Sequence, residues 1–289
     1  MHYGMILPQT EIGPDPKVLV DFVQAAEQSG FAFVSVYDHV LGADASARPD
    51  WPGPYDATHQ FHEPFVLYGY LAAHCSLELS TGVLILPQRQ TALVAKQAAE
   101  VDILTGGRFR LGVGTGWNWV EYEALGEDFA TRGDRYEEQI ELLRRLWTED
   151  VVSFEGRYDR VEAAGILPRP VQRPIPIWMG GGAGGRVLER IGRLGDGWVA
   201  RAAPGYGLEE AWEAVVGSAI AAGRDPSGVG LQGLVEPGED PDGERLQRQL
   251  ARWRAFEATT HLAVSGLHAG RSPREHVEWV RRAGEAVFG

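Results

Sequence analysis

Cysteine, lysine and long apolar runs are all scarce in this chain of 289 residues. Cys75 is the single cysteine, which excludes a scaffold held together by disulfides. No run of about 18 apolar residues occurs, so we expect no membrane span. The first residues lack the basic region and the long apolar stretch of a signal peptide. These absences predict a soluble protein of the cytoplasm.

Positive charge is scarce as well, because 27 Lys and Arg face 40 Asp and Glu, for a net charge of -13. Lys17 and Lys96 are the only lysines. Binding of nucleic acid requires a basic stripe that displaces counterions from the phosphates. The composition therefore argues against a nucleic-acid partner. The 44% of hydrophobic residues, in turn, excludes a disordered chain.

What the chain does contain is an alternation of strand-like and helix-like segments from end to end. Apolar runs bounded by glycine or proline predict strands over 3–7, 33–37, 79–86, 109–113, 175–179, 197–200, 229–235 and 261–264. Apolar residues at helical spacing predict helices over 16–29, 63–76, 91–104, 132–149, 186–194, 208–222, 243–258 and 273–288, and a hairpin is expected over 151–158. Eight such units predict one α/β domain over 1–289, a (β/α)8 TIM barrel, whereas fewer units would leave an open doubly wound sheet.

Two loops that follow predicted strands are long enough to be insertions at the carboxyl ends of the barrel strands. One covers 41–60 and is kept irregular by its prolines, Pro49, Pro52 and Pro54. The other covers 117–131. In a barrel of this kind the active site lies where the strands end and these loops begin, so the residues after each strand are the candidates.

Asp38 and His39 form the most reactive pair in these positions, directly after the second predicted strand. Imidazole titrates near neutral pH, which makes His39 a candidate general acid or base. The alternative for His39 is an ordinary surface histidine. Asp38 either accepts a hydrogen bond from a ligand or caps the backbone of the loop.

The run Gly180–Gly185 precedes a predicted helix, where free backbone amides suit a phosphate group. It matches the G-x-G-x-x-G pattern, but 199–203 holds no acidic residue to bind a ribose, which argues against NAD(P). A monophosphate on a barrel loop fits better, with Arg186 adding charge, and a flexible turn is the alternative.

Two further patterns carry weaker predictions. His59 and His62 lack further ligands at a recognisable spacing, so we predict no metal site. Trp51, Trp117 and Trp119 form either an aromatic wall over a flat ligand or part of the core.

Four stretches together resemble the bacterial luciferase-like oxidoreductases, in particular the branch that uses the deazaflavin F420, over nearly the whole chain. They are Tyr37-Asp38-His39, the segment 81–98 with Thr81-Gly82-Val83-Leu84 and Lys96-Gln97-Ala98, the segment 107–117, and the segment 192–198. The resemblance implies a TIM barrel in which the cofactor lies across the carboxyl ends of the strands. It also implies a homodimer and a small-molecule substrate.

The resemblance also assigns roles to individual residues. It implies a cis peptide at Gly82–Val83 behind the deazaflavin ring, and it places the cofactor phosphate on the amides of the glycine run. Asp38 becomes a cofactor contact, and His39 the group near the reactive carbon. The residues so implied, together with two possible hydrogen-bond donors and the neighbouring arginine, are Asp38, His39, Gly82, Val83, Thr115, Asn118, Gly182, Ala183, Gly184 and Arg186.

The implied activity is hydride transfer between F420 and a small organic substrate, with His39 giving or taking the accompanying proton. The family's sugar-phosphate dehydrogenases carry a glutamate where this chain has Trp117, and they use lysines that this chain lacks, which argues against a sugar-phosphate substrate. Two rival interpretations remain. One is an FMN-dependent monooxygenase that uses reduced flavin and O2, and the other is a non-catalytic barrel that binds a flavin or another ligand.

Overall fold

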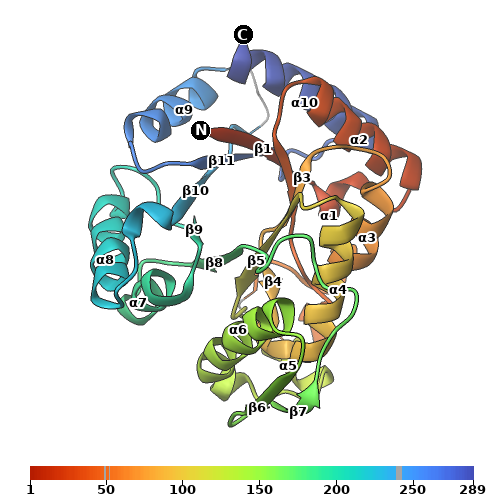
Figure 1. Cartoon of the computed structure of the whole chain (residues 1–289). Coiled ribbons are helices and arrows are strands. Elements are labelled where there is room, and N and C mark those ends of the chain that lie inside the picture. The colour runs from red at the N-terminus through yellow and green to blue at the C-terminus, as the bar shows by residue number, and fades with distance from the viewer. Residues whose placement is uncertain (49, 52, 239–242) are drawn as a thin grey trace.

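The structure is a computed structural model that describes residues 1–48, 50–51, 53–238 and 243–289. Within these residues, parallel strands form a closed barrel in the order β3-β2-β1-β11-β10-β9-β8-β5, and a pairing of β3 with β5 closes the ring. Figure 1 shows the helices on the outside of this ring. The barrel strands are β1 (His2–Ile6), β2 (Phe33–Val36), β3 (Glu78–Thr81), β4 (Leu84–Ile85), β5 (Phe109–Gly114), β8 (Ile177–Gly181), β9 (Gly197–Ala200), β10 (Gly230–Val235) and β11 (His261–Ser265). The predicted TIM barrel is confirmed.

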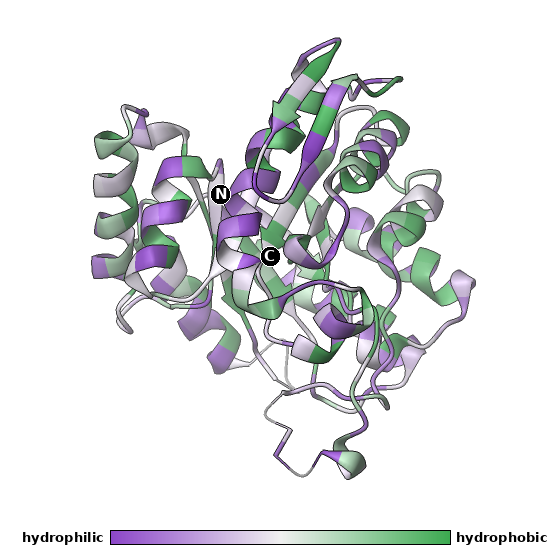
Figure 2. Cartoon of the chain, turned by 90° about the horizontal axis from the view of Figure 1, so that it is seen from below, coloured by the Kyte–Doolittle hydropathy of each residue, from purple (hydrophilic) through white to green (hydrophobic). Residues whose placement is uncertain are grey.

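Several helices around the barrel, α2, α7, α9 and α10 among them, bury one apolar face and expose a polar one, and ribbons in Figure 2 carry both purple and green. The helices of the described chain are α1 (Gln9–Ile12), α2 (Pro16–Gln28), α3 (Pro64–Leu71), α4 (Thr91–Leu104), α5 (Trp119–Ala124), α6 (Arg132–Thr148), α7 (Gly185–Leu194), α8 (Leu208–Ala221), α9 (Glu244–Ala255) and α10 (Pro273–Phe288). None of the helices in the described part of the chain combines the length and the apolar character needed to cross a bilayer.

The strand predicted over 79–86 is interrupted, and β3 and β4 share one barrel position. The peptide bond between Gly82 and Val83 is cis, as the resemblance implied. The side chain of Val83 fills the space beside two glycines of neighbouring strands. A Cβ atom at Gly114 or Gly180 would lie only 2.6 or 2.7 Å from a Val83 methyl group. Only glycine therefore fits at these two positions, because Val83 packs directly against the backbone of β5 and β8.

Several element boundaries differ from the prediction. The predicted hairpin over 151–158 is displaced, because β6 (Val152–Glu155) pairs with β7 (Arg160–Ala164) across a longer turn. The helix predicted over 63–76 ends at Leu71, where the chain turns so that Leu77 can enter the core. The loop 41–60 contains a short 3-10 helix, Ala45–Ala47, started by the Asp44 side chain, so it is not wholly irregular. Pro49 and Pro52 lie outside the described residues.

The amino-terminal end of the barrel is filled by a buried cation among aromatic rings. The guanidinium carbon of Arg110 lies 4.3 Å from the ring centre of Trp178 and 5.0 Å from that of Phe33, and its Nε donates to Glu78 at 2.8 Å. Burial lowers the pKa of the neighbouring His261 to about 3, and the charge of Arg110 acts in the same direction. This packing leaves the carboxyl ends of the strands as the face for a ligand.

Candidate active site

His39 lies just beyond the carboxyl end of β2, within a group of aromatic side chains. The centre of its ring is 4.6 Å from that of Phe61, 5.4 Å from that of Tyr55 and 5.5 Å from that of Trp117. Its side chain is 11% exposed, and its Nδ1 lies 3.2 Å from Oε1 of Glu121. His39 is therefore a largely enclosed imidazole rather than an ordinary surface histidine.

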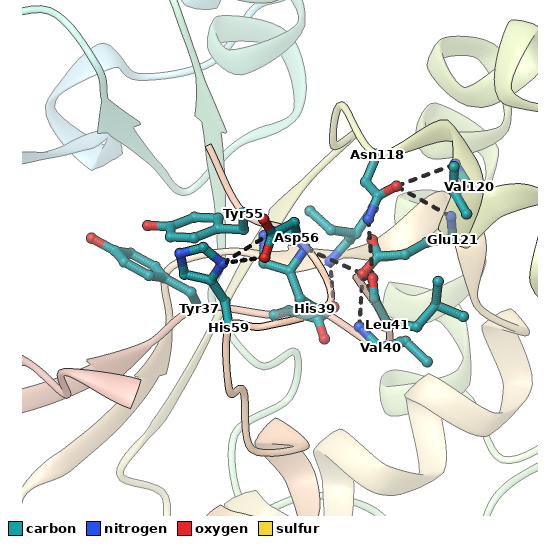
Figure 3. Close-up of polar contacts among 12 residues, drawn as sticks. Tyr37, His39, Val40, Leu41, Tyr55, Asp56, His59, Asn118, Val120 and Glu121 are labelled. Carbon is teal, nitrogen blue, oxygen red and sulfur yellow. Dashed lines mark hydrogen bonds and ion pairs between the residues drawn. The ribbon is translucent and has the colours of Figure 1, made fainter. Parts of the chain in front are cut away.

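Glu121 and Asn118 hold the segment that follows His39 (Figure 3). Oε1 of Glu121 accepts hydrogen bonds from the backbone amides of Val40 at 2.8 Å and Leu41 at 3.3 Å. Asn118 caps α5 through its side-chain oxygen and donates from Nδ2 to the carbonyl of Leu41 at 3.1 Å. One N–H of the Asn118 amide is thus used within the protein, and a hydrogen bond from Asn118 to a cofactor stays a prediction.

Glu121 is the functional candidate that the sequence analysis missed. An asparagine followed three residues later by a glutamate is a pattern typical of a helix start. That pattern, Asn118 to Glu121, would have predicted α5 inside the loop 117–131. It would not have shown that the glutamate faces His39, because the two residues are 82 positions apart in the sequence.

Asp38 is buried and both of its oxygens have partners. Oδ1 accepts from Arg89 at 2.7 Å, and Oδ2 accepts from the backbone amide of Ile85 at 2.9 Å. Arg89 also contacts Glu63 at 3.3 Å. Burial raises the pKa of the Asp38 carboxyl, and the guanidinium of Arg89 opposes that increase. These contacts correspond to the structural alternative for Asp38, in which it holds the loop before His39.

The Gly82–Val83 segment lies between the His39 loop and the glycine run. The amide of Gly82 donates to the carbonyl of Val36 at 2.7 Å, at the end of β2. Val83 packs against Gly180 in β8. Thr115, directly after β5, is half-buried, and its carbonyl accepts from the hydroxyl of Tyr122 at 2.6 Å. The candidates from β2, β3, β5 and β8 therefore gather at one end of the barrel.

The residues Gly182, Ala183, Gly184 and Arg186 are exposed at the amino terminus of α7. Gly184 caps this helix without any side-chain hydrogen bond, and a Cβ atom at Gly182 or Gly184 would meet open space. Within the described chain, no acceptor is bonded to the backbone amides of 182–186, and Arg186 makes no ion pair. Free amides at the positive end of a helix dipole form an anion-binding surface.

The three tryptophans of the two long loops come together. The ring centre of Trp51 lies 5.5 Å from that of Trp117 and 6.2 Å from that of Trp119. A Cβ atom at Gly53 would lie 1.9 Å from the indole of Trp117, so only glycine fits there. The loops 41–60 and 117–131 thus meet over His39, and their aromatic side chains restrict water around its ring.

A second part of the site carries hydroxyl groups and charge. Figure 3 shows Tyr37 and Tyr55 side by side, with their hydroxyls pointing the same way. Burial raises the pKa of Tyr37, and the charges of Glu236 and Arg201, at the ends of β10 and β9, also act on it. Gln9 connects this part to the loops, since its Nε2 donates to the Tyr37 carbonyl at 2.8 Å.

The histidines considered as metal ligands point to different partners. Nδ1 of His59 lies 2.9 Å from Asp56, whose pKa is lowered to about 2 by hydrogen bonds from Thr58 and then from His59. Nε2 of His62 lies 3.4 Å from the carbonyl of Gly13. Over the described residues, no three His, Cys, Asp or Glu side chains converge on a common point.

Comparison with known proteins identifies the family and the fold. A family model described as luciferase-like monooxygenase matches residues 1–286. An F420-dependent glucose-6-phosphate dehydrogenase from Gordonia bronchialis is 32% identical over 257 residues, which cover 85% of this chain and 71% of the relative. A solved F420-dependent secondary alcohol dehydrogenase in complex with an F420-acetone adduct is similar with a TM-score of 0.81 and 20% identity, over 100% of this chain and 99% of that chain.

A second solved structure, the monooxygenase RslO1 from Streptomyces bottropensis, is similar with a TM-score of 0.76 and 20% identity, again over 100% of this chain and 99% of the other. At this identity the two structures support the fold alone, and they include both an F420 enzyme and a monooxygenase. The match over residues 1–286 shows the family directly: the chain belongs to the luciferase-like monooxygenases.

Proposed function

We propose that this protein is an F420-dependent oxidoreductase that transfers a hydride between F420 and a small organic substrate, with His39 as the proton donor or acceptor. One observation carries the proposal: an enclosed imidazole and a helix start capped only by glycine lie on either side of the Gly82–Val83 segment, at one end of the barrel. The names of an F420-dependent relative and of an F420-dependent structural neighbour support the choice of cofactor.

The residues present fit an anionic cofactor tail. The second half of the glycine run, 182–185, offers backbone amides without an acceptor in the described chain, Gly182 and Gly184 have open space where a side chain would stand, and Arg186 adds a positive charge. Gly182, Ala183 and Gly184 would hold the phosphate. Gly82, Val83 and Thr115 would line the ring side of the site. Asp38, whose oxygens both have partners, would act on the cofactor through the loop that it holds.

When bound, F420 supplies or accepts the hydride. The chain's own contribution is proton transfer and exclusion of water. Nε2 of His39 has no hydrogen-bond partner in the described chain, so this nitrogen is the one free to exchange a proton with a substrate. The surrounding aromatic rings restrict competing water around the imidazole.

We further propose that the substrate carries no phosphate group. Both lysines lie on helices outside the barrel. Lys17 on α2 pairs with Asp21, and Lys96 on α4 donates to the carbonyl of Leu167 at 2.8 Å. Position 117 holds a tryptophan that packs on His39. Glucose 6-phosphate is therefore expected to be a poor substrate, although a relative is named for it.

The test is cofactor binding by the purified protein, measured by fluorescence with F420 and with FMN. We expect F420 to bind, and we expect Gly182→Asp to weaken binding about tenfold or more, because a carboxylate repels the phosphate. Gly217→Asp is the matched control, since Gly217 is exposed on α8 with open space around it. Binding of FMN without F420 would establish the monooxygenase interpretation instead. Cofactor binding without turnover of any substrate would favour the non-catalytic barrel.

A further inference from the structure

We infer that Glu121 is a positioning residue that holds His39 in the tautomer with the proton on Nδ1, so that Nε2 presents its lone pair to the substrate. This inference rests on the proposed role of His39 in proton transfer. Neither the sequence motifs nor the family match identifies Glu121 as a residue of the site. The reason is that α5 was not predicted and that Glu121 lies far from His39 in the sequence.

The direction of the hydrogen bond follows from the other contacts of the same oxygen. Oε1 of Glu121 accepts from the amides of Val40 and Leu41, which are obligate donors. An oxygen that accepts from two amides is the acceptor for the imidazole as well, so Nδ1 of His39, at 3.2 Å, must be the donor. In the neutral ring the lone pair then belongs to Nε2, which has no partner in the described part of the chain.

Glu121 is enclosed at the start of α5 and faces His39. The side chain is 1% exposed, and it lies in the first turn of α5, where the amide of Glu121 itself is capped by Asn118. Within the described residues its one charged partner is His39, whereas the nearby Asp38 is neutralised by Arg89. A buried carboxylate paired with one imidazole orients the ring and stabilises the imidazolium that forms when Nε2 takes up a proton.

A purely structural role makes a different prediction. If Glu121 served only to clamp the loop, its contacts with Val40 and Leu41 would suffice, and the position of the imidazole proton would not depend on it. Replacement by alanine separates the two roles, because only a tautomer-fixing role predicts a change in the position of the imidazole proton. Replacement by glutamine isolates the charge, because its amide oxygen can accept the same three hydrogen bonds.

The experiment is a measurement of the imidazole 15N chemical shifts with histidine-labelled protein in the absence of cofactor, with the His39 signals assigned by their loss in His39→Gln. We expect the Nδ1–H tautomer in the wild type and in Glu121→Gln, and a shift toward Nε2–H in Glu121→Ala. Glu123→Ala is the matched control, since Glu123 is exposed on the same helix and has no ion pair within the described chain. It should leave the spectrum unchanged.

Turnover provides the second readout. Glu121→Ala should lose about tenfold or more in kcat, up to the 10²–10⁴-fold that a general acid or base contributes, and Glu121→Gln should retain more activity. The Nε2–H tautomer in the wild type, or an unchanged tautomer in folded Glu121→Ala, would overturn the inference. If Glu121→Ala does not fold, the wild-type tautomer still decides. Because the spectra need no F420, failure of the proposed function would leave this result intact.

Discussion

Replacing Arg89 with methionine tests what holds the chain in place directly before His39. The Asp38 side chain is 1% exposed and that of Arg89 is 13% exposed, and the two lie 2.7 Å apart. Removing one partner of a buried ion pair leaves the other charge uncompensated, which typically costs about 3–5 kcal/mol. Methionine keeps most of the apolar volume, so the loss reports mainly on the charge. We expect Arg89→Met to lower the free energy of unfolding by about 3 kcal/mol.

The assay is urea denaturation of Arg89→Met, Asp38→Asn and the double variant. The sum of the stability losses in the two single variants should exceed the stability loss in the double variant, because residues in one ion pair do not contribute independently. Arg145→Met is the matched control, since Arg145 pairs with Glu149 at 2.7 Å but the two side chains are 32% and 41% exposed. An exposed pair of this kind contributes about 0.3–0.5 kcal/mol.

The pH dependence of this loss has a definite sign. Arg89 lowers the pKa of Asp38, so its removal raises that pKa further above the value in the unfolded chain. The native variant then binds a proton that the unfolded chain has released, so its stability falls as the pH rises through this window. The deficit of Arg89→Met should therefore shrink from neutral to mildly acidic pH. A loss below about 1 kcal/mol at neutral pH, similar to the control, would refute the interpretation of Asp38 as a buried charge held by Arg89.

Two further predictions concern the imidazole and its aromatic surroundings. His39→Ala should lower turnover about 10²–10⁴-fold while F420 affinity, measured by fluorescence, stays nearly unchanged; unchanged turnover would remove His39 from the mechanism. Gly53→Ala should displace the indole of Trp117, because the new Cβ atom would lie 1.9 Å from it, and we expect a changed near-UV circular dichroism spectrum and weaker substrate binding. A wild-type spectrum for this variant would show that the two long loops do not meet as the structure has them.

The barrel could be predicted from the sequence because its strands and helices are encoded locally. Apolar runs ended by glycine or proline located the strands, and their carboxyl ends marked the segments that hold His39 and the glycine run. The second strand of the predicted hairpin, β7, was placed too early in the sequence because its residues 160–164 are mostly exposed and show no apolar alternation. The boundaries of β7 are set by its pairing with β6 rather than by the sequence of residues 160–164 alone.

The contacts of Asp38 and His39 in the candidate site could not be predicted from the sequence, because their partners lie far away along the chain. Asp38 meets Arg89 across 51 residues, and His39 meets Glu121 across 82. Such pairs depend on the conformations of loops, which periodicity does not describe. Asp38 therefore had two open interpretations in the sequence, and only the position of Arg89 distinguishes a side chain held inside the protein from one that faces a ligand.

The loop after β5 is where this sequence differs most clearly from the family's sugar-phosphate dehydrogenases, and the structure shows how the difference changes the contacts of His39. Position 117 carries an indole that packs on the imidazole of His39, where the family's sugar-phosphate dehydrogenases have a carboxylate. A carboxylate nevertheless reaches His39, from Glu121, which lies four residues further along the chain in α5, and it contacts Nδ1. The acidic group is thus held behind the ring, while an aromatic surface lies beside it. We therefore expect this exchange to disfavour a phosphorylated substrate at this imidazole, in line with the proposed function.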